Sequence, residues 1–547
     1  MKQMTLCVPL EVKPESCSRL STLVEELRQQ EDTGEFGIPE NFARVCRDIP
    51  TLHFMSMSVF VAAEYDPIFI LEANFDGPPG VFWGQMEAAF GSRLRDMLRC
   101  CKEPLDEDGP LYEAVTQLDS RSPVAPYFEA RTQRPSVFHH GNRGLSRDSI
   151  CGEAALFDAV QRELDEPDER GPSPYRGIPA CEVHRKLRGR LLPARPWLDG
   201  SPPERFPRAE RLLDMLKLAL FAVVVILGLS LPGTLLAAAM PWPECLVLFA
   251  VLAIAACALI YWKRDPLPDT EVPTNFKLGS FLLRNAPIIG IYVLVATLLI
   301  VPLMVLPSAL LNLFGLGSGI GFWDAFRGVA RAVLLGLVSL AAILPLLLLW
   351  LRHLERRDSW HDAPHVNERL LREMVRREDW VTQNHMGSIV LIKPGILRMI
   401  IIRAGHLGLG LVLRVVATDG YLGSMRTVHF AHWAFLNNGS RLLFFSNFDH
   451  SWDSYLDDFI EKAHGGLTLA WGCGVGFPPT RFLVYDGASH GRQFKNWALA
   501  SRAVSRFWYS AYPTLTVDQI ARNNRIANGL RQPSLNEEEA RRWIRDL

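Results

Sequence analysis

Four long apolar segments in the middle of the chain limit its architecture more than any other feature. They cover 212–239, 244–262, 286–311 and 332–351. Each has close to the ~20 residues that an α-helix needs to cross the hydrocarbon core of a bilayer. Four segments of this length argue against buried helices of a soluble protein. We therefore expect a four-helix transmembrane domain over 211–352, with the lipid bilayer as its partner.

Basic residues flank these segments unequally. Loops 232–243 and 312–326 contain no Lys or Arg, and only Arg327 and Arg331 lie at the outer end of the fourth segment. Because Lys- and Arg-rich flanks stay in the cytoplasm, we predict a multi-pass protein of the plasma (inner) membrane with both termini cytoplasmic. The flanks that decide this orientation are Arg205, Arg208, Arg211, Lys217, Lys263, Arg264, Lys277, Arg284, Arg352, Arg356 and Arg357.

A fifth apolar run, 396–417, contains Arg398, Arg403, His406 and Arg414. Charged side chains at the centre of a bilayer are costly, which argues against a further crossing. The pattern favours an interfacial helix whose arginines reach toward water. A helix buried on a sheet is the alternative.

The two soluble parts contain the same landmarks in the same order. TLHFMSMSVF and PIFILEANFDG in the first part match TVHFAHWAFL and RLLFFSNFDH in the second, so His53 aligns with His429 and Asp76 with Asp449. Upstream, VPLEVKP matches IVLIKP, and downstream GLSRDSI matches TLTVDQI. Matching landmarks of this kind indicate an internal repeat, with one copy over 1–164 and the other over 385–531.

Each copy predicts the same order of elements. A strand ending in Lys-Pro precedes a helix, two β-rich runs pair as a hairpin, and a second helix and a final strand follow. This β-α-β-β-α-β order is ferredoxin-like, and its sheet leaves one face in need of a partner. We therefore predict an α+β fold in which two ferredoxin-like repeats pair as one barrel and flank the transmembrane helices. Composition indicates a Pro/Arg-rich linker at 165–210, a charged linker at 353–384 and a charged C-terminal tail at 532–547.

The tandem copies resemble the dimeric α+β barrel superfamily, which includes dye-decolourising haem peroxidases, over about 1–160 and 385–530. Those peroxidases carry a GxxDG motif whose aspartate lies beside the haem. Residues 73–77 read ANFDG, with Ala in place of the first Gly, and 446–450 read SNFDH, with neither glycine. The runs NHMGSIVLIKPG and FFSNFDHSWDSYLDDF also resemble a bacterial membrane-protein family of unassigned activity. The resemblance implies haem as cofactor and a peroxidase-like oxidoreductase.

The matched aspartates are the first candidate site residues. Asp76 and Asp449 are predicted to act as acid/base or haem-side catalytic groups, with Arg143 as a distal catalytic group and Arg481 as another candidate. The competing interpretation is that an aspartate after a strand caps the next helix.

The matched histidines are the second group of candidate site residues. His53, His429 and His139 are the predicted haem ligands, because haem iron binds a neutral imidazole. Strand alternation would place His53 on the face of Met55, opposite Phe54. A strand histidine that is simply hydrogen-bonded in place is the alternative. Further candidate ligands are His140, His385, His432 and His464.

The charge balance and the cysteine spacing argue against other classes of function. The net charge of -1 argues against a nucleic-acid partner. The ten cysteines form no CxxC pair and no zinc spacing, so we predict no metal centre and free thiols in a reducing compartment. The N-terminus lacks the apolar core of a signal peptide. Two functions remain open: a membrane protein whose paired domains bind a hydrophobic or planar ligand, as a peroxidase-like enzyme, and a non-catalytic membrane-anchored sensor or scaffold.

Overall fold

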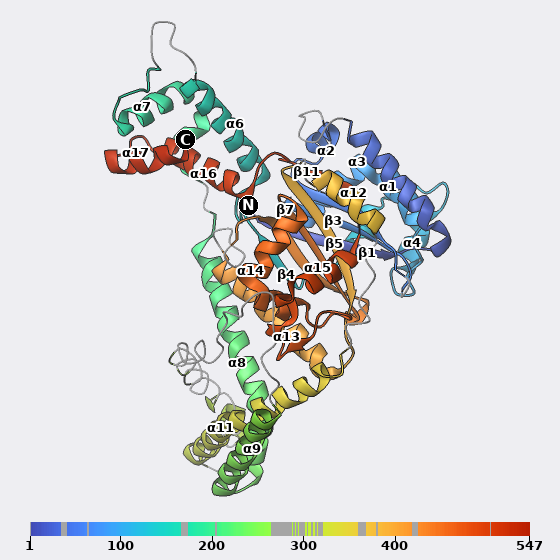
Figure 1. Ribbon diagram of the computed structural model, residues 1–547, viewed down its shortest axis with the longest axis vertical. Helices are drawn as coiled ribbons and strands as arrows, with labels where there is room; N and C mark the ends of the chain where they lie inside the picture. The colour runs from blue at the N-terminus through green and yellow to red at the C-terminus, as the bar shows by residue number, and fades with distance from the viewer. Residues whose placement is uncertain are drawn as a thin grey trace.

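The computed structural model describes residues 2–33, 41–62, 65–165, 173–202, 205–263, 321–358, 368–378, 381–417, 425–503 and 505–547, with isolated residues between 287 and 314. Figure 1 shows three parts. Two facing sheets with their covering helices form the centre, a group of long helices extends to one end, and a cluster of shorter helices lies at the other.

Both central sheets are antiparallel, as predicted for an α+β fold. The order of the first sheet is β1 (Gln3–Glu11), β3 (Ile68–Asp76), β2 (Leu52–Phe60) and β11 (Ser505–Ser510). The order of the second sheet is β10 (Arg502–Ala503), β5 (Gln383–Leu391), β7 (Arg441–Asp449), β6 (Val428–Leu436) and β4 (Val137–His140).

The closing strand of each repeat lies in the sheet of the other repeat. β4, from the first repeat, pairs with β6, and β11, from the second, pairs with β2. The sequence predicts that the final strand of each ferredoxin-like repeat closes the sheet of that same repeat. In the structure, each final strand instead joins the sheet of the other repeat. The exchange pairs the backbone groups that β2 and β6 would otherwise leave open at a sheet edge. It also ties the two sheets to each other through the backbone.

Side chains from both sheets fill the space between them. Phe60, Ile70, Leu443 and Phe445 belong to one buried cluster in this space. The aromatic rings of Phe54 and Phe430, at matched positions of the two hairpins, lie 5.5 Å apart. The sheet edges also approach each other, because Gln133 N donates to Cys7 O at 2.8 Å beside β4.

Helices cover the outer faces of both sheets. Helices α1 (Cys17–Glu31) and α3 (Pro79–Arg99) pack on the first sheet, where Val24 and Phe90 enter its core. Helices α13 (Ile396–Val416), α14 (Trp452–Trp471) and α15 (Gly491–Ala500) cover the second sheet. Ser451 caps α14 by accepting a hydrogen bond from Ser454 N.

The segments that composition marks as a linker and a tail contain folded helices. α6 (Arg147–Asp165) and α16 (Val517–Arg531) end the two repeats and share one core with α7 (Ala180–Leu191) and α17 (Glu537–Trp543). The Trp543 indole donates to Ile526 O at 3.2 Å and lies edge-on to the ring of His184. The helices α7 and α17, from 165–210 and 532–547, therefore belong to a four-helix cluster with α6 and α16 (Figure 1).

Four described helices are long and apolar enough to cross a membrane. They are α8 (Arg208–Ala239), α9 (Trp242–Trp262), α11 (Phe322–Glu355) and α13. The first three contain three of the four predicted segments, which makes the chain a candidate integral membrane protein. The remaining predicted segment, 286–311, lies outside the continuously described residues.

Helix α13 has two different sides. Ile402 and His406 are buried toward the second sheet, and Gly408 lies against Phe221 of α8. Ile400 and Val416 remain exposed on the other side. The helix therefore packs on a sheet, which is the alternative that the sequence left open, and presents an apolar stripe outward.

Helices α8 and α11 pack closely through small residues. A Cβ atom at Gly233 would lie 2.3 Å from Ser339 Cβ, and one at Gly336 would lie 3.0 Å from Thr234 Cβ. Contacts in this order make the two helices antiparallel. Close approach through Gly, Ser and Thr is the usual basis of helix association in a bilayer, where hydrophobicity cannot drive it.

Candidate functional site

The two predicted catalytic aspartates each form a buried pair with the matched histidine of the same repeat. His53 Nε2 lies 3.1 Å from Asp76 Oδ2, and His429 Nε2 lies 2.7 Å from Asp449 Oδ1. All four side chains are at most 3% exposed. The repeat therefore reproduces a histidine–aspartate pair, and not only a sequence pattern.

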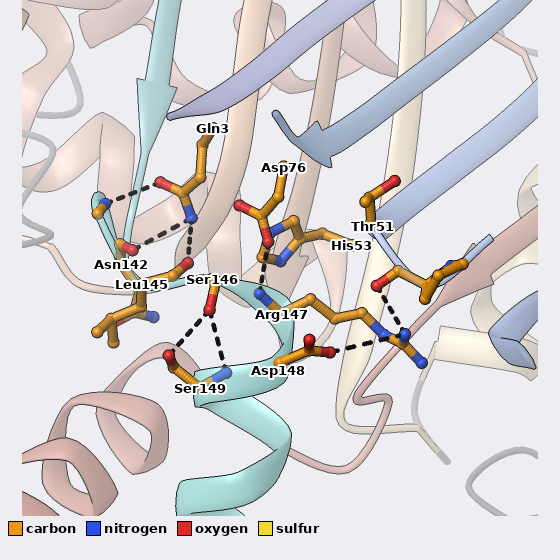
Figure 2. Close-up of polar contacts among 12 residues, drawn as sticks. Gln3, Thr51, His53, Asp76, Asn142, Leu145, Ser146, Arg147, Asp148 and Ser149 are labelled. Atoms are coloured by element: carbon orange, nitrogen blue, oxygen red, sulfur yellow. Dashed lines mark hydrogen bonds and ion pairs between the residues drawn. The ribbon is translucent and has the colours of Figure 1, made fainter. Parts of the chain in front are cut away.

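Each aspartate also holds the first backbone amide of a helix. Arg147 N donates to Asp76 Oδ2 at 2.7 Å, as Figure 2 shows, and Val517 N donates to Asp449 Oδ2 at 2.9 Å. These residues begin α6 and α16, the helices after the closing strands. The helix-cap interpretation predicted that the two aspartates cap the next helices in the chain, α3 and α14. They do cap helices, but these are the more distant α6 and α16. A carboxylate at a helix N-terminus satisfies an amide that has no partner within the helix.

A glutamine on the neighbouring strand supports the same helix start. Gln3 Nε2 donates to Leu145 O at 2.8 Å (Figure 2), and Gln383 Nε2 donates to Leu515 O at the matched position of the second repeat. Gln3 pairs with Asp76 in the β1–β3 register, and Gln383 pairs with Asp449 in the β5–β7 register. The two repeats thus use the same glutamine and aspartate contacts to attach their last helices, α6 and α16, to the sheets.

A β-bulge changes the direction of both histidines. The β2–β3 register shifts between Leu52 and Phe54, and the β6–β7 register shifts between Val428 and Phe430. The bulge turns His53 to the same side as Phe54, and both rings contact Phe430. The prediction that His53 shares a face with Met55 is therefore wrong, because a bulge interrupts strand alternation.

The three predicted haem ligands have different surroundings. His53 Nδ1 lies 2.9 Å from the Tyr512 hydroxyl, and its Nε2 lies 3.1 Å from Asp76 Oδ2 but forms no hydrogen bond within the described residues. His429 uses Nε2 toward Asp449. His139 pairs with Ala431 on the outer face of the second sheet, away from the other two. Within the described residues, no group of three His, Cys, Asp or Glu is placed to hold a metal ion.

Arg143 lies at the junction with the membrane helices. Its guanidinium donates to Arg414 O at 2.9 Å and lies 3.2 Å from Glu210 and 3.4 Å from Asp214 of α8. Its contacts therefore bind α8 to α13, and the structure places it in a junction rather than beside Asp76 or Asp449.

A similar junction joins the end of α11 to the second repeat. The buried Glu355 carboxylate accepts hydrogen bonds of 2.9 Å from Phe482 N, Leu483 N and Thr480 Oγ1. Phe482 and Leu483 have positive φ angles, which turns their amides toward this carboxylate. Beyond the helix, Asp358 lies 3.0 Å from Lys393. These hydrogen bonds attach the C-terminal end of α11 to the loop 480–483.

A second polar cluster lies in the closed space between the sheets, around Glu72. Its carboxylate accepts from Ser56 Oγ at 2.9 Å and from Asn74 Nδ2 at 2.7 Å within the first repeat. From the second repeat, His385 Nε2 lies at 3.2 Å and His432 Nδ1 at 3.8 Å. Both histidines were candidate ligands from the sequence, and the structure brings them to a carboxylate that the sequence analysis missed.

The register shows how this cluster arose from the repeat. Ser56 pairs with Glu72 on β2 and β3, and the equivalent pair on β6 and β7 is His432 with Phe445. Thr5 pairs with Asn74, and the equivalent pair is His385 with Asn447. The first repeat therefore supplies the carboxylate and the second supplies both imidazoles. One signal was visible, since Glu72 is the only charged residue before Asp76 in the apolar strand IFILEANFD.

Burial and charge set the protonation of this cluster. Burial raises the pKa of Glu72, but the interactions with His385, His432 and Asn74 together outweigh it, and the net pKa lies below its ordinary value. Burial lowers the pKa of His432 to about 4. Burial also lowers the pKa of His139 to about 4 and that of His140 well below its ordinary value. At neutral pH the cluster is an ionised carboxylate with the neutral imidazole of His432.

An apolar cavity of ≈ 200 Å³ lies on the outer face of the second sheet, between α13, α14 and α15. Its described polar lining consists of Ser388, Tyr455 and Ser501. The two serine hydroxyls lie 2.7 Å apart, and the Tyr455 hydroxyl lies 3.2 Å from Ser446 Oγ. The described lining thus carries no carboxylate, imidazole or thiol, and it is suited to an apolar molecule. Its aromatic walls are Trp433, Phe444, Phe459, Trp471, Phe494 and Trp497.

Comparisons of the chain with family models, curated proteins and solved structures found no match. The resemblance to the α+β barrel superfamily therefore stays a prediction.

Proposed function

We propose that the protein is a non-catalytic, membrane-anchored receptor that binds an apolar molecule in the second repeat. The observation that carries the proposal is the cavity between α13, α14 and α15, whose walls are aromatic and aliphatic. Ligand sites are typically apolar with a few polar groups that fix orientation. Its hydroxyl groups belong to Ser388, Ser501 and Tyr455, and no described lining residue supplies a carboxylate or imidazole that could activate a serine, which favours binding over catalysis.

The position of the cavity supports an apolar ligand that arrives from the bilayer. Leu409 and Leu413 of α13 line the cavity, and Ile400, Leu407 and Val416 of the same helix are exposed on its outer side. Helix α13 also packs on α8. We place both repeats on the cytoplasmic side, because Lys217, Lys263 and Arg356 lie at the repeat-facing ends of the long helices.

The ion-pair junctions offer a route from the cavity to the membrane helices. Helix α13 carries Arg398, which binds Asp358, and Arg414, which lies near Asp214 of α8. A ligand that shifts α13 would change these contacts. This arrangement favours a sensor over a passive anchor, because an allosteric device needs an element that both sites contact.

A cavity-filling variant tests the proposal. A Cβ atom at Gly466, which lines the cavity, would meet no atom within 4 Å, so Gly466→Leu would fill space without a backbone clash. Gly84→Leu is the matched control, because Gly84 is an open helical glycine of α3 in the first repeat.

The measurement is quenching of tryptophan fluorescence in the purified full-length protein by a dibrominated fatty acid. Trp433, Trp471 and Trp497 line the cavity, so wild type and Gly84→Leu should show saturable quenching, and Gly466→Leu should lose that component. Quenching of the membrane-helix tryptophans should be the same in all three proteins. Equal saturable quenching in Gly466→Leu would refute the proposed site.

The haem-peroxidase hypothesis makes a different prediction. It requires a Soret band in the purified or haem-supplemented protein and a shift of that band when His53, His139 or His429 is replaced. We expect colourless protein, because Asp76 and Asp449 lie directly against the Nε2 atoms of the buried His53 and His429. A Soret band that responds to these replacements would favour the enzyme over the receptor.

A further inference from the structure

A second cavity, separate from the apolar one, lies where the membrane helices meet the second repeat. It measures ≈ 230 Å³ and is formed by the last turns of α9 and α11 together with Arg481 and Phe482. Four permanent cations line it, namely Lys263, Arg352, Arg356 and Arg481, together with His353. No acidic side chain is among its described lining residues.

Two carboxylates of the described residues contact arginines that line this cavity. Glu355 lies 3.2 Å from Arg352 and also accepts three bonds from the loop 480–483. Asp486 lies 3.4 Å from Arg481. The guanidinium of Arg356 donates to Lys263 O at 2.7 Å, which holds the ends of α9 and α11 together around the cavity.

Apolar and aromatic residues indicate that this cavity lies at the boundary between the headgroups and the hydrocarbon core of a bilayer. Its other walls are Leu259, Ile260 and Leu349, one turn back into the apolar parts of α9 and α11. Tyr261 is 66% exposed, Trp262 80% and Trp350 47%. Exposed tyrosines and tryptophans at helix ends mark the headgroup level of a membrane. A ligand here would meet cations on one side and hydrocarbon on the other.

We propose that this cavity binds the headgroup of an anionic phospholipid, with the phosphate among Lys263, Arg352 and Arg356 and an acyl chain along Leu259 and Leu349. Basic pockets between membrane helices recognise such headgroups, and arginine forms paired hydrogen bonds with phosphate. Because Arg481 and Phe482 close the cavity, a bound lipid fixes the loop 480–483 against α11. The proposal does not depend on occupancy of the apolar cavity.

The test compares full-length protein in detergent with added phosphatidylglycerol or phosphatidylcholine of the same acyl chains. Lipid retained through gel filtration and the unfolding midpoint are both measured. Wild type should retain phosphatidylglycerol selectively and unfold at a higher temperature with it. The double variant Lys263→Gln/Arg356→Gln should bind it about thirtyfold more weakly, since each basic side chain near an anionic lipid is worth roughly fivefold. Lys263→Gln alone, at an exposed side chain, should lose about fivefold and serves if the double variant does not fold.

The matched control is Arg327→Gln/Arg331→Gln at the other end of α11, which should retain wild-type selectivity. Equal retention of both lipids by wild type, or equal losses in the control and in the test variant, would overturn the proposal. So would equal stabilisation by inorganic phosphate without lipid, because the site would then take a soluble anion.

Discussion

Glu72 and His385 lie 3.2 Å apart between the two sheets, and each comes from a different repeat. The equivalents of Glu72 and His385 are Phe445 and Thr5, so neither repeat contains the pair by itself. Two first repeats placed face to face would bury two carboxylates together, which is strongly unfavourable. The contact therefore selects pairing of the first repeat with the second, in addition to the exchanged strands.

Substitution of the pair should show strong coupling. Glu72→Gln and His385→Asn should each destabilise the protein, and the double variant should be more stable than the sum predicts, by about 1–3 kcal/mol. The measurement is a double-mutant cycle on thermal or denaturant unfolding in detergent. The control is a cycle of Glu72→Gln with His184→Asn, because His184 lies in the separate helical cluster. The effects of these two substitutions should be additive within about 0.5 kcal/mol. Additivity of the Glu72–His385 cycle would contradict the selective role of this contact.

Loss of either capping aspartate should loosen one C-terminal helix. Asp76→Ala leaves Arg147 N without its 2.7 Å acceptor, and Asp449→Ala does the same to Val517 N. Each should lower the free energy of unfolding by about 1–3 kcal/mol, the cost of an unsatisfied buried amide. Amide hydrogen exchange should rise in the first turn of α6 or α16, respectively. Asp148→Ala, in the same first turn but 88% exposed at its side chain, should change little, and an equal effect there would argue against the cap.

Stability should fall as the pH drops from about 6.5 to 4. The folded-state pKa values of His139 and His432 are about 4, and that of His140 is also well below its ordinary value. In the unfolded chain these histidines titrate near 6.5, so in this window the unfolded state binds more protons. Each contributes up to about 1.4 kcal/mol of lost stability per pH unit.

A histidine variant can separate this effect from general acid lability. His139→Gln should make the dependence of the unfolding midpoint on pH shallower, since one titrating group is removed. His450→Asn is the control, because His450 is exposed and has a positive φ that Asn tolerates. If both variants keep the wild-type slope, buried His139 does not contribute to the pH dependence.

Packing of α8 on α11 should depend on specific glycines. Gly336→Leu would place a Cβ atom 3.0 Å from the backbone nitrogen and Cβ of Thr234, so the helices must separate. We expect destabilisation of roughly 1–3 kcal/mol, as for overpacking elsewhere, with a lower yield of folded protein from the membrane. Gly328→Leu on the same helix meets no atom within 4 Å. A folded yield of Gly336→Leu equal to that of Gly328→Leu would exclude close packing at this position.

Local pattern in the sequence determined the elements of this protein and their repetition. Three described apolar helices follow directly from runs of about 20 hydrophobic residues, and the matched hairpins follow from β-rich runs around His53 and His429. Ser451 caps the helix that begins beside it, so this contact is also local in sequence. These features depend on neighbours in sequence, so sequence suffices for them.

Only the tertiary structure decided which distant segments meet. The amide that Asp76 accepts is 71 residues away, and its pairing partner β1 begins at Gln3. Strand periodicity cannot show a bulge at His53 or that β4 and β11 change sheets, because both depend on which edge a strand finds. The Glu72 cluster and the basic cavity are likewise assembled from segments far apart in the chain, where burial and charge act through space and leave no local pattern.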